Sequence, residues 1–156
     1  MVMNKKKKTF AVYFLIVLIV FQSISGLFGG VGLLIDPNGS YLKMPLFFLR
    51  NTPFKDYLIP ALVLFFILGV YPTFIAVGLI FNLKIKWTNI INIYKDQHWV
   101  WTYSLYLGII LSLWIDFQVM FIGYWHFIQT IYALLGIAIL IIALLPNVKN
   151  YYKLTD

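Results

Sequence analysis

Four long apolar stretches dominate this sequence, and each is long enough to cross a lipid bilayer as a helix. The first runs from Phe10 to Ile35 and is interrupted only by Gln22, Ser23 and Ser25. As an α-helix it would be about 39 Å long, whereas the hydrocarbon core of a bilayer is about 30 Å thick. We therefore predict an all-α polytopic membrane protein, one integral domain over residues 1–156 built as a bundle of four transmembrane helices, at about 10–35, 57–81, 99–121 and 125–145.

The composition excludes most classes of soluble protein. Only 11% of the residues are charged and 62% are hydrophobic, whereas about 25% of the residues in a typical soluble domain are charged. The net charge of +7 does not indicate nucleic-acid binding, because the basic residues flank the apolar stretches. The absence of cysteine excludes disulfides and thiolate chemistry. The expected partners are the lipid bilayer and either another membrane protein or a second copy of the chain, and no cofactor is expected.

The distribution of Lys and Arg predicts the orientation, because basic residues accumulate on the cytoplasmic side of bacterial membrane proteins. The side that would hold both termini carries Lys5, Lys6, Lys7, Lys8, Lys84, Lys86, Lys95, Lys149 and Lys153. The other side carries Lys43, Arg50 and Lys55. We expect both termini in the cytoplasm and the protein in a bacterial inner or plasma membrane.

Two connectors have a sequence pattern of their own. In residues 86–96, Trp87, Ile90, Ile91 and Tyr94 follow the spacing of one helix face, which predicts a short helix on the cytoplasmic membrane surface. The outer loop, residues 36–56, opens with Asp-Pro-Asn-Gly, which favours a type I turn. Near its end, Thr52-Pro53 is typical of the start of a helix.

Small residues in the outer half of the first helix allow three interpretations. Ser25 and Gly29, and Gly26 and Gly30, are i, i+4 pairs, so they form a strip against which another helix can pack closely. The glycines could instead let the helix end deform or approach a ligand. A signal peptide cut after Ser25 is the third interpretation, but the apolar run continues to Ile35, which favours an intact helix.

Polar residues within the apolar stretches are the candidates for function, because such residues are costly in a bilayer. Gln22 is the most central, and one interhelical hydrogen bond would satisfy it. Pro72 is expected to kink the second helix. The outer face is expected to collect Asp36, Asp56, Asp116 and His126.

Asp116 and His126 lie on either side of one tight connection and could pair. Together with the other two carboxylates, they could bind a metal or relay a proton. The alternative is that all four are interfacial residues that satisfy one another or lipid headgroups. No metal-binding HExxH motif, GxSxG motif or P-loop is present.

Three segments resemble an uncharacterised family of small bacterial four-helix integral membrane proteins. They are LLIDPNGSYLKMP, TPFKDYLIPALVLFFILGV and FIGYWHFIQTIYALLGIAILIIALLPNVKNYY. The resemblance implies a four-helix fold and implies no activity.

The sequence leaves three functions open. The first is a non-enzymatic accessory, regulatory or self-associating membrane component. The second is a small transporter or channel, which would have to be an oligomer because only Gln22 is polar near the bilayer centre. The third is a membrane enzyme that uses the outer Asp and His residues.

Overall fold

The structure is a computed structural model that describes residues 2–3 and 7–155. It confirms an all-α fold with four helical spans that are long and apolar enough to cross a membrane. These spans are α1 (Phe10–Ile35), a second span (Leu58–Phe81), α4 (Trp99–Ile122) and α5 (Phe127–Leu144). The second span consists of α2 (Leu58–Leu62), η2 (Val63–Val70) and α3 (Tyr71–Phe81). The short elements are β1 (Val2–Met3), η1 (Leu46–Leu49), η3 (Trp87–Asn89), α6 (Pro146–Tyr151) and β2 (Leu154–Thr155). The chain is therefore a small multi-pass membrane protein.

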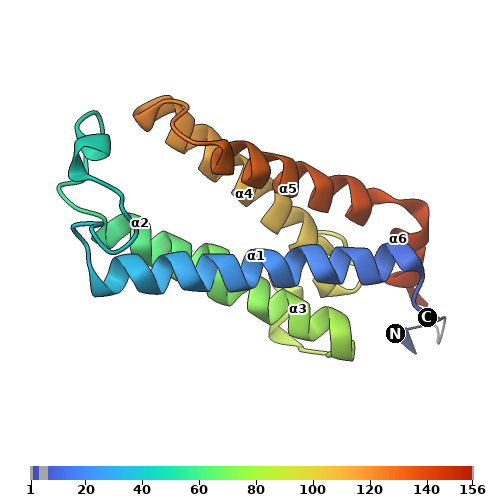
Figure 1. Ribbon diagram of the computed structural model, residues 1–156. Coiled ribbons are helices and arrows are strands. Elements are labelled where there is room, and N and C mark those ends of the chain that lie inside the picture. The colour runs from blue at the N-terminus through green and yellow to red at the C-terminus, as the bar shows by residue number, and fades with distance from the viewer. Residues whose placement is uncertain (1, 4–6, 156) are drawn as a thin grey trace.

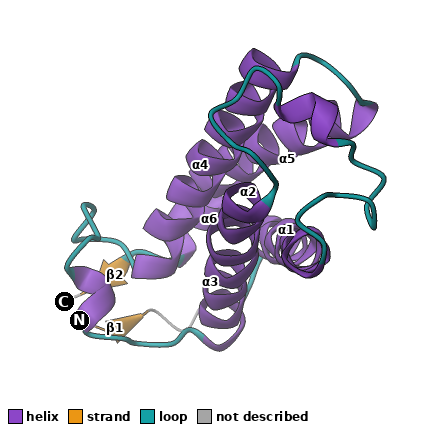
Figure 2. Ribbon diagram, turned by 90° about the vertical axis from the view of Figure 1, so that its left-hand side faces the viewer, coloured by secondary structure: helices purple, strands orange, loops and turns teal. Residues whose placement is uncertain are grey.

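The four spans form two pairs, because α1 packs mainly against the second span and α4 mainly against α5. In Figure 1 the pairs lie close together near the two chain termini and diverge towards the opposite end. We call these the terminal end and the loop end, and the loop end carries residues 36–57 and 123–126. Figure 2, viewed from the loop end, shows the α4–α5 pair tilted away from α1 and α3. The bundle is thus closed at one end and open at the other.

Pro72 shapes the middle of the second span. η2, immediately before α3, is π-helical, a form that is rare in proteins and marks a local widening of the helix. Pro72 has no N–H to donate to the carbonyl of Leu68, four residues earlier. Gln22 Nε2 on α1 donates to that carbonyl instead, over 3.0 Å. The most central polar side chain of α1 therefore satisfies a backbone group in the irregular part of its neighbour.

Glycines bring α1 and η2 into close contact at the same level. A Cβ on Gly26 would overlap the carbonyl group of Leu68, and one on Gly30 would lie 2.7 Å from Phe65 Cα. Gly69 on η2 faces α1 in return, since its Cβ would be 2.9 Å from Leu27 N. Gly29 has open space around it. The strip predicted on α1 thus divides: Gly26 and Gly30 lie in the helix contact, whereas Gly29 lies outside it.

Ser25, the fourth member of that strip, satisfies its own helix. Its hydroxyl donates to the carbonyls of Phe21 and Gln22. Its neighbour Ser23 forms the polar link between the helices, because its hydroxyl shares a hydrogen bond with the hydroxyl of Thr73 on α3.

The main hydrophobic core lies towards the terminal end and is rich in aromatic side chains. Trp99, Trp101, Tyr103 and Tyr152 are all buried in it. Their N–H and O–H groups donate hydrogen bonds to backbone carbonyls; for example, Trp101 Nε1 donates to Ala143 O over 2.7 Å. Such aromatic groups bury a large area while their N–H or O–H groups bind an acceptor. A second, smaller core of Leu33, Leu49, Tyr57 and Ala61 lies under the outer loop.

The helix expected over residues 86–96 is not formed. Only the 3-10 turn η3 is present, and the rest of the segment is irregular. The apolar side chains are exposed as expected, but Thr88 and Asn92, which would lie on the opposite, solvent-facing side of such a helix, are buried. The prediction was wrong because Asn92 and the backbone carbonyl of Thr88 accept hydrogen bonds from α4 instead of facing solvent.

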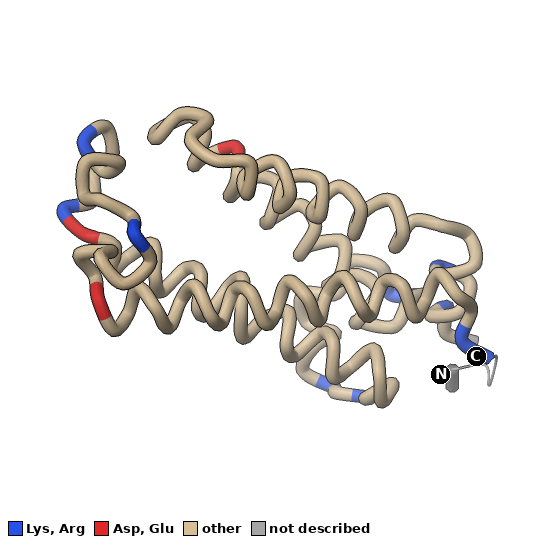
Figure 3. The backbone as a smooth tube through the Cα atoms, in the orientation of Figure 1, with Lys and Arg blue, Asp and Glu red and all other residues tan. Residues whose placement is uncertain are grey.

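Charged residues gather at the two ends of the molecule, as the membrane prediction requires. Figure 3 shows the middle of the helices free of Lys, Arg, Asp and Glu. Lys and Arg occur at both ends, and the loop end also holds acidic residues. The apolar centre of the bundle therefore matches the hydrocarbon core of a bilayer.

Candidate functional site

Asp36 closes the turn that begins the outer loop. Its Oδ1 accepts from Asn38 N over 3.2 Å and its Oδ2 accepts from Tyr41 N over 2.8 Å. Its backbone carbonyl accepts from Gly39 N, and Gly39 adopts a φ of 78°, which glycine tolerates. Both carboxylate oxygens are thus engaged with the backbone of their own turn.

Asp56 has a similar local role at the start of the second span. Its Oδ1 accepts from Leu58 N over 2.9 Å, which satisfies one of the free N–H groups of the first helical turn. The helix start predicted at Thr52-Pro53 is wrong, because α2 begins only at Leu58. Thr52 instead closes a tight turn, with its hydroxyl donating to Leu49 O and accepting from Phe54 N.

His126 is the N-cap of α5. Its Nδ1 accepts from Ile128 N over 3.2 Å. Gln129 completes a capping box, since its Oε1 accepts from the backbone N–H groups of Trp125 and His126. The imidazole is therefore directed to the helix backbone, and no hydrogen bond joins it to Asp116 in the structure.

Asp116 differs from the other three candidates because no described residue hydrogen-bonds to its carboxylate. It is exposed on the side of α4. It lies six residues before the end of that helix at Ile122, which is about 9 Å at the rise of an α-helix. This position is inside the span Trp99–Ile122, and a carboxylate without a partner is costly within a membrane span.

The four candidates therefore do not form one cluster in this structure. Among the described residues, no group of three or more His, Asp or Glu side chains is placed to hold a metal ion. Three of the four side chains support local backbone turns, and the fourth stands alone. The arrangement supplies helix capping at the loop end and leaves one carboxylate free for an intermolecular contact.

The sequence analysis missed a buried polar network at the terminal end, which we call the connector network: Thr88, Asn92, Gln97, Thr102 and Tyr103. Asn92 is its centre, with Nδ2 donating to Gln97 O over 3.0 Å and Oδ1 accepting from Thr102 Oγ1 over 2.6 Å. Tyr103 Oη donates to Thr88 O over 3.0 Å. The connector is thus tied to α4 by side chains. The only signal in the sequence was the number of polar residues in residues 88–97, which is equally typical of a solvated helix face.

His98 lies next to this network and is also buried. Its Nδ1 faces Val100 N at 3.5 Å, while its Nε2 is buried and has no partner among the described residues. Burial, and secondarily the charge of Lys84, lowers the pKa of His98 to about 4. The imidazole is therefore neutral at neutral pH, and His98 joins the connector to the tail because its backbone N–H donates to Tyr152 O.

Lys8, just before α1, caps the C-terminal end of α3. Its Nζ donates to Leu79 O over 3.1 Å and to Ile80 O over 2.7 Å. An ammonium group is favourable at the C-terminus of a helix, where free carbonyls carry partial negative charge. Partial burial lowers the pKa of this ammonium group. Lys8 therefore contributes a contact between helices as well as charge.

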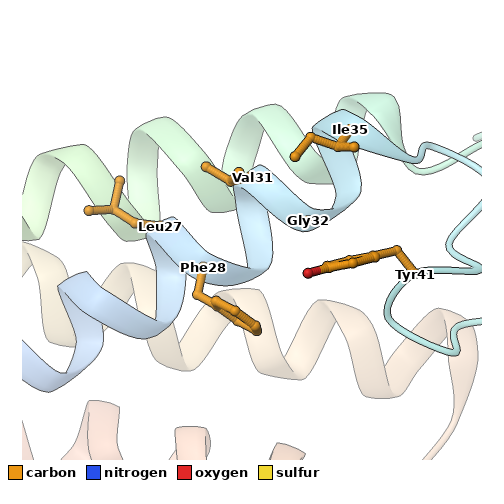
Figure 4. Close-up of a pocket in the computed structure, with 6 residues that line it drawn as sticks. All are labelled: Leu27, Phe28, Val31, Gly32, Ile35 and Tyr41. Atoms are coloured by element: carbon orange, nitrogen blue, oxygen red, sulfur yellow. The ribbon is translucent and has the colours of Figure 1, made fainter.

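At the loop end, the outer loop reaches across the gap between the two helix pairs. Phe48 of η1 is buried against Trp125, with ring centroids 4.2 Å apart. An open apolar groove of about 320 Å³ also lies along the end of α1, as Figure 4 shows. Its lining residues are Leu27, Phe28, Val31, Gly32, Ile35 and Tyr41.

Comparison with known protein families, curated proteins and solved structures finds no match to this chain. The resemblance to a bacterial family therefore stays a prediction. The class of the protein rests on its own four spans.

Proposed function

We propose that this chain is a non-enzymatic component of a bacterial cell membrane that acts by associating with another membrane-embedded helix. The observation that carries the proposal is Asp116, an exposed carboxylate on the side of α4. Acidic groups within a membrane span are usually paired or directed to a protein interior. The capping roles of Asp36, Asp56 and His126 weaken the alternative of an outer-face enzyme, because their polar atoms are engaged with backbone groups.

The partner that fits Asp116 is a transmembrane helix with a basic or hydrogen-bond-donating side chain near the same depth. The neighbouring side chains on α4 suit such a contact, since Leu113, Phe117 and Met120 are apolar and exposed. An exposed apolar surface alone would be covered by lipid, but a carboxylate within it favours a protein partner. This partner is either a different polypeptide or a second copy of the chain.

The orientation belongs to the same proposal. We place the terminal end in the cytoplasm because nine of the twelve basic residues flank the spans on that side. The loop end, with Asp116 nearest to it, then faces the outside. Reporter fusions at Thr155 and at Gly39 would test this directly. We expect a cytoplasmic readout at Thr155 and an external readout at Gly39.

Native mass spectrometry of the full-length protein, released gently from its own membrane, tests the association. We expect a second polypeptide or a second copy at a fixed ratio, and we expect Asp116→Asn to lose it. Asp56→Asn is the matched control, because it removes the same charge at the same end while asparagine preserves the cap. A wild-type protein that is monomeric and free of partners would contradict the proposal.

The same measurement separates the two other candidate functions. A retained metal ion or small molecule would favour a transporter or an enzyme. A ring of several copies around polar side chains such as Gln22 would favour a channel.

A further inference from the structure

The groove at the loop end is open, narrow and apolar, as a site for one hydrocarbon chain would be. It follows the last turns of α1 from Leu27 to Ile35, a length of about 12 Å. Its volume of 320 Å³ is at the lower limit of the ~300–1,000 Å³ typical of small-molecule sites. Phe28, Val31 and Ile35 are all exposed in it, and no charged side chain lines it.

The outer loop holds the far wall of this groove in place. Leu42 packs on Gly32, where a Cβ would lie 3.1 Å from the Leu42 side chain. The Asp36 carboxylate binds the backbone N–H of Tyr41. Figure 4 shows the Tyr41 ring lying alongside α1 with its hydroxyl directed towards Phe28. The absence of a side chain at Gly32 and the anchored turn therefore position the Tyr41 ring along one side of the open groove.

Charge distinguishes the mouth of the groove from the rest of the lipid-facing surface. The outer loop carries Lys43, Arg50 and Lys55 against Asp36 and Asp56, so its net charge is +1. Lys43 follows the lining residue Tyr41 by two residues and adopts a φ of 55°, which is uncommon for a residue with a side chain. The loop beside this apolar groove therefore has a small excess of positive charge.

We propose that this groove binds one acyl chain of an anionic phospholipid and that Lys43, beside the mouth, binds its headgroup. The apolar wall of α1 contacts one side of the chain, and the Tyr41 ring lies along the other. Basic residues at the membrane surface attract anionic lipids in this way. The proposal is independent of the association through Asp116, which uses α4.

The test uses the full-length protein in a mild detergent, titrated with phosphatidylglycerol or with phosphatidylcholine of the same acyl chains, and counts bound lipids by native mass spectrometry. We expect one phosphatidylglycerol to bind about fivefold more tightly than phosphatidylcholine, the effect of one basic residue near an anionic headgroup. Lys43→Gln should remove this preference and leave phosphatidylcholine binding unchanged. Val31→Trp should fill the groove and weaken binding of both lipids.

Two control variants separate the site from general effects of charge and bulk. Lys84→Gln removes a basic residue at the terminal end, and Val17→Trp adds the same ring to an exposed position on α1 away from the groove. Both should bind lipid as the wild type does. Equal binding of the two lipids to the wild type would overturn the proposal, and so would an unchanged preference in Lys43→Gln or equal behaviour of Val31→Trp and Val17→Trp.

Discussion

The two ends of this molecule are stabilised in different ways. At the terminal end, side chains connect parts of the chain that are distant in sequence: Lys8 binds the end of α3, and Trp101 binds α5. At the loop end, Asp36, Asp56 and His126 bind backbone groups within five residues, and Tyr57 Oη donates to Pro45 O twelve residues away in the same loop. Long-range contacts fix helices relative to one another, whereas local caps fix only the turns that contain them. The terminal end is therefore the rigid base of the bundle, and the loop end is the part that can respond to a lipid or a partner.

The largest expected effect on stability comes from disrupting the glycine contact between α1 and η2. In Gly26→Leu, the new side chain would overlap the Leu68 carbonyl, so the two helices would have to separate. We expect the free energy of unfolding to fall by about 3 kcal/mol or more, since overpacking commonly costs 1–3 kcal/mol before any helix displacement. Thermal unfolding in detergent would measure this.

Gly29→Leu is the matched control, because it adds the same side chain three residues along the same helix, where space is open. It should unfold near the wild-type temperature. Equal destabilisation by both variants would mean that the helix contact does not determine the loss, because helix propensity alone favours leucine over glycine at both positions.

The next effect concerns the connector network. Asn92→Ala removes the donor to Gln97 O and the acceptor of Thr102 Oγ1, and both remaining groups would stay buried. We expect a loss of about 2 kcal/mol, as is usual for buried polar groups left without partners. Asn89→Ala, at an exposed position in the same connector, should cost less than about 0.5 kcal/mol. Similar losses in the two variants would show that the network does not stabilise the terminal end.

The smallest predicted effect is a pH dependence of stability caused by His98. Burial and Lys84 lower the pKa of His98 to about 4, while an unfolded histidine titrates near 6.5. Between these values the unfolded state binds the extra proton, so stability should decrease as the pH falls from about 6.5 to 4 and then level off. Down to pH 5, about 1.5 units below the pKa of an unfolded histidine, the expected loss is about 2 kcal/mol at most.

His98→Asn tests the assignment of this pH dependence. It should reduce the slope of the melting temperature against pH. An unaltered slope in His98→Asn would assign the titration to another group.

Much of this fold could be predicted from the sequence, because bilayer thickness and hydrophobicity determine a span almost without reference to the rest of the chain. The four spans of the structure begin and end within two residues of the predicted ranges. The hydrogen bond of Gln22 follows the same logic, since a central polar group in a membrane must find a partner. These features depend on length and polarity alone.

The wrong and missing predictions concern polar side chains that could face solvent, bind a neighbouring turn or bind a distant helix. Asn92 has the spacing of a solvent-facing helix position, but Thr102 of α4 provides a buried partner. The sequence places Asp36 and His126 on the same side of the membrane and so suggests that they could meet. In the structure, each binds a backbone N–H group of its own turn instead. Periodicity cannot distinguish these choices, because they depend on tertiary geometry.

The central claim, that the two helix pairs are held together at the terminal end and diverge at the loop end, can be tested by double electron–electron resonance. The chain has no cysteine, so pairs of introduced cysteines can carry spin labels at exposed positions. One pair, Phe10→Cys with Leu144→Cys, reports on the terminal end, and the other, Ile35→Cys with Met120→Cys, reports on the loop end. In lipid nanodiscs we predict one narrow distance distribution for the first pair and a broad distribution for the second. Equally narrow distributions for both pairs would contradict the account.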